Sequence, residues 1–512
     1  MRTSLRFFSF ALLGVLTVSL CATVAQAQMT ARIVRINGDA NQATVTNPGV
    51  APASAVPNLL ISEGASIETR AGVELFVETF PGAVATIRQN SLVRLTSLRL
   101  VAVGVDAGKR AAELELQRGS VISTLDPSKQ AITKYGIKTP RGVAAARGTV
   151  YGVSVIPAAG GGGSSSALVL SGTVVIDRGP GEPPITIPFG QGAVDNDDEA
   201  SQLRALIARS PSLAADVLAA VGIVAANVAF ATSAAGSPDS AARLLTSVTS
   251  AAVGALPGQA PAIVQIVMGA IVAPGSAIGS NPQAVLGAIS AVTDAAVRAV
   301  IAAGGGLSQA GAAARAAGHG VVQGYMTNAM DAARAANPGI SPAALLAAAN
   351  QAAGGEPVTS ALGVIGNVAT GTAVRMLGQS GDAGGASATG AGIGQAESAG
   401  ASAGALAALT GAGVPNPGGF TPPIVDVQVQ TGQPSGVTTI AALIAGTTSS
   451  SSWTGTGADP VTTQTSGPGG QTTTVVPPKP PAGGSGSGAP PPRANVTPLL
   501  PINPAQNVSP SH

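Results

Sequence analysis

The spacing of apolar and polar positions changes twice along the 512-residue chain. Between about residues 30 and 195, short runs alternate apolar and polar residues and are separated by Gly, Pro, Asn or Asp, which is typical of strands and turns. In residues 113–116, two leucines and two glutamates fall on opposite faces, as in a half-buried strand. Many short strands without intervening helices predict an all-β domain over residues 28–200, either a β-sandwich or a β-solenoid, that folds on its own.

Residues 201–375 are rich in alanine, and their apolar positions recur with a helical period. The stretch 282–302 has the clearest apolar stripe, and the apolar stretch 261–273 is shorter than the roughly 20 residues that span a membrane. This pattern favours a soluble, alanine-packed helical bundle over a membrane region. Proline marks the expected helix starts, mostly after a Ser or Asn that can cap the helix, at Pro211, Pro238, Pro261, Pro282 and Pro342.

Residues 376–512 consist mainly of Gly, Ala, Ser, Thr and Pro. Such a composition buries too little apolar surface to offset the entropy of the chain, so it predicts a low-complexity, mostly disordered tail. Within it, residues 424–429 alternate like an isolated strand, which is either a transient patch or a segment that pairs with a partner.

Residues 1–27 have the form of a secretory signal peptide, because two arginines and an apolar run precede the small-residue motif Ala25-Gln26-Ala27. An uncleaved anchor is the alternative. Leu20 before Cys21 does not fit a lipidation motif. The signal peptide would direct the chain to the periplasm or beyond. Cleavage after Ala27 would then remove the only cysteine and leave no membrane span.

Charge and histidine content limit the classes of function that the chain could have. Without the two arginines of the leader, the chain has 24 basic and 24 acidic residues, which argues against binding nucleic acid or anionic membranes. His319, between two glycines, is expected in an exposed turn, with a Ser-His-Asp triad as the alternative. Glu113 and Glu115 are expected to point outward with no cleft beside them. No metal-binding spacing is present, so we expect no catalytic residue, cofactor or metal site.

The most distinctive stretch is residues 139–155. Thr139-Pro140 signals a turn, a run of small residues follows, and Arg147-Gly148-Thr149 leads into an alternating strand in which Tyr151, Val153 and Val155 share one face. A glycine in this place indicates a positive φ or a close backbone approach. The main interpretation is a tight turn that feeds a core strand, and the alternative is a binding role for Arg147 or Thr149.

Three further pieces accompany this stretch: residues 116–121 around Gly119, residues 169–174 around Gly172, and residues 189–192. In this order, the four pieces resemble the FecR domain, named for periplasmic regulators of ferric-citrate uptake, over about residues 30–195. The resemblance implies a solenoid-like β fold. It also implies signalling to a sigma factor through a cytoplasmic arm, but at most six residues precede the apolar run of the leader, so that direct contact is not expected.

These observations favour an exported, non-catalytic protein that acts as a binding or structural module of the cell envelope, with an envelope protein or a glycan as its partner. A periplasmic sensing component that lacks the cytoplasmic arm is the alternative. An enzyme is the third class, but the sequence contains no recognisable catalytic site for it.

Overall fold

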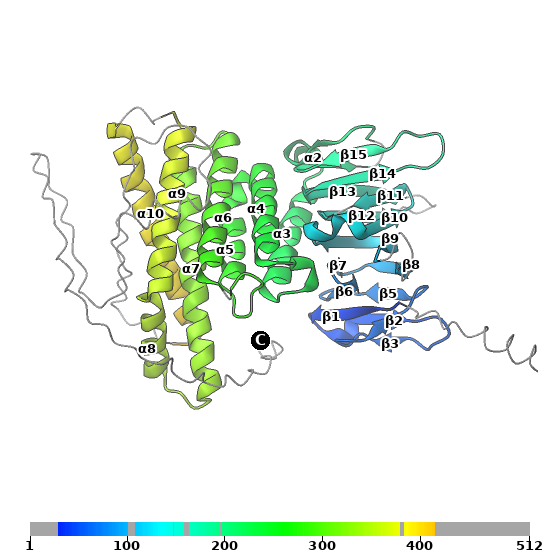
Figure 1. Cartoon of the computed structure of the whole chain (residues 1–512), viewed down its shortest axis with the longest axis horizontal. Helices are drawn as coiled ribbons and strands as arrows, with labels where there is room; N and C mark the ends of the chain where they lie inside the picture. Colours follow the sequence, from blue (N-terminus) through cyan, green and yellow to red (C-terminus); the bar gives the residue numbers. More distant parts are fainter. Residues whose placement is uncertain are drawn as a thin grey trace, which may run out of the picture. The chain divides into compact units, whose positions relative to one another are not determined.

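The computed structural model describes residues 29–100, 108–146, 148–157, 163–194, 197–279, 281–378 and 383–414. Within this part, strands occupy the chain up to Gln202 and α-helices follow from Leu203, as the change in apolar spacing predicted (Figure 1). The leader, Arg147 and residues 424–429 lie outside the described residues.

The strands form two sheets, antiparallel except where β9 and β10 pair in parallel. Sheet A has the order β4 (Leu60–Ile61), β1 (Ala31–Asn37), β6 (Glu74–Phe80), β7 (Ala83–Ile87), β9 (Arg110–Leu125), β12 (Val150–Pro157), β13 (Gly163–Ser171), β16 (Gln191–Val194) and β17 (Ser201–Gln202). Sheet B has the order β3 (Ala53–Ser54), β2 (Ala43–Thr46), β5 (Ser66–Thr69), β8 (Leu92–Leu100), β9, β10 (Thr133–Thr139), β11 (Gly142–Ala146), β14 (Thr173–Asp177) and β15 (Ile185–Pro188).

The chain passes back and forth between the sheets as it advances from β1 to β17, and the strands stack in this order in Figure 1. The arrangement therefore combines the two predicted alternatives, because two facing sheets are built by a solenoid-like progression. Strand β9 belongs to both sheets and changes from one to the other at Gly119. Gly119 has φ 88°, and a Cβ there would stand 2.5 Å from Cα of Ser91, so only glycine fits the bend.

The space between the sheets is filled by alternate, inward-pointing apolar side chains. Tyr151, Val153 and Val155 all belong to this core, whereas Val150 belongs to the core on the other side of sheet A, which confirms that the three residues share a face. The rings of Tyr135 and Tyr151 meet edge to face with 6.4 Å between their centroids. Burial raises the pKa of both tyrosine hydroxyls, so these groups stay neutral and act as part of the core.

Nine α-helices follow in the described residues. They are α2 (Leu203–Arg209), α3 (Leu213–Ala229), α4 (Pro238–Ala255), α5 (Ala260–Ile271), α6 (Pro282–Ala302), α7 (Leu307–Ala336), α8 (Pro342–Ala353), α9 (Glu356–Met376) and α10 (Ala383–Gly411). Short 3₁₀ turns occur as η1 (Ala40–Gln42), η2 (Pro127–Ile132), η3 (Ser233–Ala235) and η4 (Pro257–Gln259). The side chains of Ser237, Asn281 and Ser341 cap the first turns of α4, α6 and α8, and a proline opens each of these helices, as the sequence predicted.

Sheet A carries apolar side chains on both of its faces. Those that point away from sheet B form one hydrophobic core with the helices: Phe76, Val84, Ile122, Val150, Leu168 and Leu170. Helices α2, α3 and α4 lie nearest to the strands. Polar contacts cross the same boundary, because Arg88 Nη1 lies 2.7 Å from Asp216 Oδ1 and Asn227 donates to Thr124 Oγ1 at 3.1 Å. Sheet A is thus a middle layer between sheet B and the helices.

The helical region continues to Gly411, farther than the composition predicted, because the low-complexity tail was expected from residue 376. The reason is that small residues allow close packing. A Cβ on Gly400 would overlap the carbonyl oxygen of Arg315, and one on Gly404 would overlap that of His319, so α10 lies against the backbone of α7. Composition alone does not reveal that a glycine-rich stretch has such a partner.

His319 also differs from its prediction. It lies in the interior of α7, not in an exposed turn. The two glycines beside it serve helix packing, since a Cβ on Gly320 would stand 2.8 Å from the carbonyl oxygen of Gln265 in α5, and one on Gly318 would stand 3.0 Å from that of Glu397 in α10.

By length and composition, one helix of the described chain, α6, could cross a membrane. In this structure 61% of its apolar window is buried, because α6 packs against α4, α7 and α9. A core helix of a bundle has the same length and composition.

Candidate binding groove

A groove of about 760 Å³ crosses the outer face of sheet B, the face turned away from sheet A. It runs over β9, β10, β11 and β14, perpendicular to the strands, because the residues along its length are cross-strand neighbours. Glu113 pairs with Ser97 on one side and with Gly136 on the other, Gly136 pairs with Ala145, and Ala145 pairs with Val175.

The groove exists because outward-pointing positions in its middle carry small side chains. In β10, Lys134, Gly136 and Lys138 point outward, and the central residue has no side chain. Gly136 is followed across the sheet by Ala145, which is exposed and offers a single methyl group. The wall on one side is Val143, whose Cγ1 would stand 3.2 Å from a Cβ on Gly136. A larger side chain at Gly136 or Ala145 would therefore fill the groove.

Two charged residues of opposite sign line the groove. Glu113 Oε1 accepts a hydrogen bond from Thr96 Oγ1 at 3.1 Å, which leaves its second oxygen free of described partners. Lys134 is exposed and has no ion-pair partner among the described residues, whereas Lys138, four residues further along β10, lies 4.0 Å from Glu115. The groove can therefore offer both a hydrogen-bond acceptor and a cation to a ligand.

This placement corrects the expectation that Glu113 has no cleft beside it. Glu113 does point outward, but it lines the groove. The signal in the sequence was weak: small residues at outward positions of three strands, Ala111, Gly136 and Ala145. The turn at Thr139 and Pro140 makes β10 and β11 neighbours, but β9 joins them through a parallel pairing with β10 that no turn motif in the sequence indicates.

The distinctive stretch borders this groove. Thr139 and Pro140 form the turn between β10 and β11, where the Thr139 hydroxyl accepts from the Arg141 amide at 3.1 Å and donates to the Gly142 carbonyl at 3.1 Å. Pro140 fixes φ at the first position of the turn. These two residues hold the hairpin and do not line the groove.

Gly148, Thr149 and Gly172 meet at the opposite wall. Gly148 has φ 61°, and a Cβ there would stand 2.9 Å from Cα of Pro127. Gly172 has φ 75°, and a Cβ there would stand 2.9 Å from Thr149 Oγ1. Thr149 is fully buried and donates to the Thr173 carbonyl at 3.3 Å. Gly148 and Gly172 line the groove, Thr149 lies beneath it, and Gly119 lies apart from it at the bend of β9.

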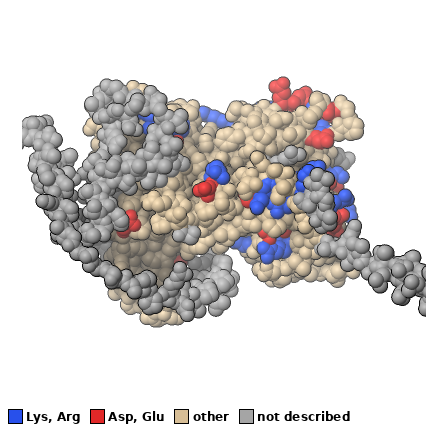
Figure 2. All heavy atoms as spheres, in the orientation of Figure 1, with Lys and Arg blue, Asp and Glu red and all other residues tan. Residues whose placement is uncertain are grey.

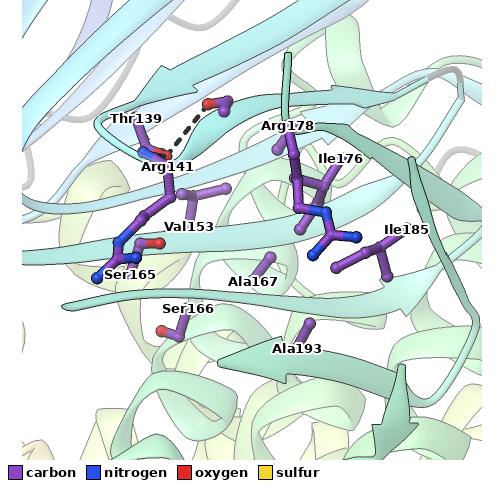
Figure 3. A pocket seen from close by; sticks show the side chains of 12 residues that line it. Thr139, Arg141, Val153, Ser165, Ser166, Ala167, Ile176, Arg178, Ile185 and Ala193 are labelled. Atoms are coloured by element: carbon purple, nitrogen blue, oxygen red, sulfur yellow. Dashed lines mark hydrogen bonds between the residues drawn. The ribbon is translucent and has the colours of Figure 1, made fainter. Parts of the chain in front are cut away.

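A second cavity lies between the two sheets, bordered by β11, β14 and β15 on one side and by β12, β13 and β16 on the other. Figure 3 shows Arg141 and Arg178 on opposite sides of it. Its volume of about 30 Å³ suits one or two water molecules. Arg178 donates hydrogen bonds to the Pro183 carbonyl and, at 2.9 Å, to Asp198. These bonds give Arg178 a structural role at this end of the sandwich.

The described residues bring together no catalytic or metal-binding set. No group of three His, Cys, Asp or Glu residues among them could hold a metal ion. His319 lies within the helical region, far along the chain from the groove, and burial lowers the pKa of its imidazole while Gln323 opposes that shift. The groove itself is lined by small, aliphatic and amide or hydroxyl side chains with one acid and one base, an arrangement suited to binding.

The part of the chain that forms the groove matches a known protein family. Residues 65–175 match the family model described as FecR protein. The match spans β5 to β14 and includes every strand that the groove crosses. No curated protein and no solved structure matched the chain.

Proposed function

Residues 65–175 are a FecR domain, and from this premise we propose that the protein is an exported, non-catalytic binding module of the cell envelope that holds its partner in the groove on sheet B. One observation carries the proposal: the two sheets differ in what covers them. Helices cover the outer face of sheet A, whereas the groove of sheet B has exposed walls at Gln130, Lys134 and Thr173, with no described residue across it.

The chemistry of the groove supports binding over catalysis. FecR domains are typically non-catalytic. Within the groove, Glu113 and Lys134 are the charged residues, and its described lining residues include no histidine or cysteine, which supports binding over catalysis.

The strand edges are poor alternatives to the groove. Strands β3, β4 and β17, which end the sheets, have two residues each, and β15 is preceded by Pro184 and ends at Pro188. Short edge strands and prolines prevent pairing with an added strand. A partner would therefore contact the face of sheet B and not its edges.

The shape and charge of this face favour an envelope polypeptide as the partner, and a glycan is the alternative. The one aromatic side chain that borders the groove, Tyr135, is buried in the core, so no exposed ring is offered there for a sugar to stack on. Residues 29–194 contain 15 Lys and Arg against 11 Asp and Glu, and Figure 2 shows basic side chains gathered over the strands. An acidic partner would be steered toward the strands and not toward the helices.

Ala145→Arg tests the proposal, because an arginine there would occupy the floor of the groove while its parent alanine is exposed and easily replaced. We expect chemical cross-linking in intact cells to capture the partner with the natural chain and to lose it with this variant. Ala53→Arg, at an exposed alanine of β3 in the same sheet, is the matched control and should retain the partner.

Two outcomes would contradict the proposal. Capture of the same partner by Ala145→Arg would exclude the groove, provided that both variants melt like the natural protein. Recovery of a full-length chain from the cytoplasm would contradict export, since cleavage after Ala27 should yield a mature protein in the envelope or medium fraction that begins at Gln28.

A further inference from the structure

Helix α10 is held against α7 by direct backbone contact. Gly400 and Gly404 face carbonyl oxygens of α7, and Gly311 of α7 faces Ala396 at 3.4 Å from the position of a Cβ. Arg334 Nη2 of α7 donates to the carbonyl oxygen of Ala412 at 2.5 Å, just beyond the end of α10. The two helices are side by side in Figure 1, and the glycine contacts bring their backbones close together.

One ionisable side chain lies inside this contact. Glu397 of α10 is 1% exposed, and neither of its carboxyl oxygens has a hydrogen-bond partner among the residues that the structure describes. Its Cγ lies 3.4 Å from the place where a Cβ on Gly318 would stand, and Leu362 Cδ2 of α9 lies 3.5 Å from the same place. The carboxyl group is therefore enclosed by α7 and α9. A charged carboxylate in such a place would be desolvated without compensation.

The charged neighbours do not supply that compensation. Glu397 is the only charged residue in the sequence of α10, and α8 contains none. Among the described groups of α7 and α9, none forms a hydrogen bond or ion pair with the Glu397 carboxyl; these groups are Arg315, His319, Tyr325, Asp331, Arg334, Glu356 and Arg375. Arg375 instead lies 3.7 Å from Asp294, and Asp331 pairs with Arg334 at 3.5 Å.

We propose that Glu397 makes the docking of α10 onto α7 and α9 depend on pH, with the helix docked while the carboxyl is neutral and released when it is ionised. Ionisation requires water around the carboxylate, and both carboxyl oxygens are buried from solvent while the helices are docked. Residues 415–512 follow α10 in the chain. Release of α10 would therefore also release the residue to which this segment is joined.

The direction of the pH dependence follows from linkage. Burial raises the pKa of Glu397 well above its ordinary value of 4.5. Between that ordinary value and the raised one, the docked state binds more protons than the released state. Docking is therefore strongest in acid and weakens as the pH rises through this window, by up to about tenfold for each pH unit.

Hydrogen exchange of the full-length protein tests the proposal. Exchange would be followed at pH 5, 6.5 and 8 and corrected for the intrinsic pH dependence of amide exchange. We expect protection of the α10 amides to fall as the pH rises from 5 to 8, by at most about tenfold for each pH unit. Amides of β9 should keep their protection over the same range.

Glu397→Gln separates this mechanism from general loosening, because glutamine has nearly the same shape and stays neutral. The variant should keep α10 protected at all three pH values. Glu356→Gln, at the start of α9, is the control and should keep the natural pH dependence.

Three results would overturn the proposal. The first is α10 protection that does not change with pH in the natural protein, and the second is the same change in Glu397→Gln. The third, which does not depend on the variant, is a Glu397 carboxyl that titrates near 4.5 in the natural protein by ¹³C NMR.

Discussion

Single glycines decide where the backbone of the β domain can turn. Gly119 permits the bend by which β9 changes sheets, Gly148 permits the close approach to Pro127, and Gly172 permits the contact with Thr149 beneath the groove. The sequence indicated a positive φ or close approach before Tyr151, and at Gly148 both occur. What the sequence could not indicate is the partner in each contact, because Ser91 and Pro127 are distant from these glycines in the chain.

The Gly148 contact leads to a prediction about stability. Gly148→Val should lower the free energy of unfolding by about 1–3 kcal/mol, because a side chain at φ 61° is strained and would press on Pro127. Gly179→Val is the matched control, since Gly179 has φ 98° but no atom within 4 Å of a Cβ, so it reports backbone strain alone. Thermal melts of the mature protein would measure both. Equal losses would show that the Pro127 contact contributes nothing.

At the scale of elements, the period of apolar residues predicted the order of strands and helices. It did not predict which elements pack against each other in space. The helix starts at Pro238, Pro282 and Pro342 were readable because caps are local. The groove was not, because it depends on the parallel pairing of β9 with β10 across η2. Helix α10 was missed for the same reason, since its stability comes from contact with α7 and not from its own apolar content.

The contact between sheet A and α3 gives a second prediction. Arg88 and Asp216 are about four-fifths buried, and Asp216 also lies 3.4 Å from Ser154 Oγ. Burial raises the pKa of Asp216, and the neighbouring Arg88 opposes this shift. Removing Arg88 alone would leave a buried carboxylate without its cation, so a double-mutant cycle of Arg88→Ala and Asp216→Ala should give a coupling energy of about 1–3 kcal/mol.

An exposed pair provides the comparison for this cycle. Arg298 and Asp294 are 2.6 Å apart on the surface of α6 with half of the arginine exposed, and should couple by about 0.3–0.5 kcal/mol. Urea unfolding of the mature protein would measure both cycles. A coupling at Arg88 no larger than that at Arg298 would mean that this ion pair does not join the strands to the helices.

For the whole molecule, the strands and the helices do not have separate hydrophobic cores, although the sequence changes from strands to helices at one point. The composition changes near residue 200, and from that change residues 28–200 were expected to fold on their own. In the structure, six large apolar side chains of sheet A belong to the core of the helical region. Arg35 makes a similar connection, since its guanidinium lies 3.7 Å from the centre of the Phe230 ring at the end of α3. The β domain therefore depends on the helices for the cover of one face.

The last prediction concerns this dependence. A chain that ends at Gln202 would expose the outer face of sheet A, including Phe76, Ile122 and Leu168. Burial of each such side chain contributes about 1.5–3 kcal/mol, and an exposed patch of this kind promotes association. We expect the fragment 28–202 to bind a hydrophobic dye, to melt well below the longer chain and to self-associate in analytical ultracentrifugation. A chain that ends at Val414 keeps α2 to α10 and should behave like the full protein. If the shorter fragment is instead monomeric, binds no dye and melts at the same temperature, the helices do not stabilise the β domain, and the cover they give to sheet A has no energetic role.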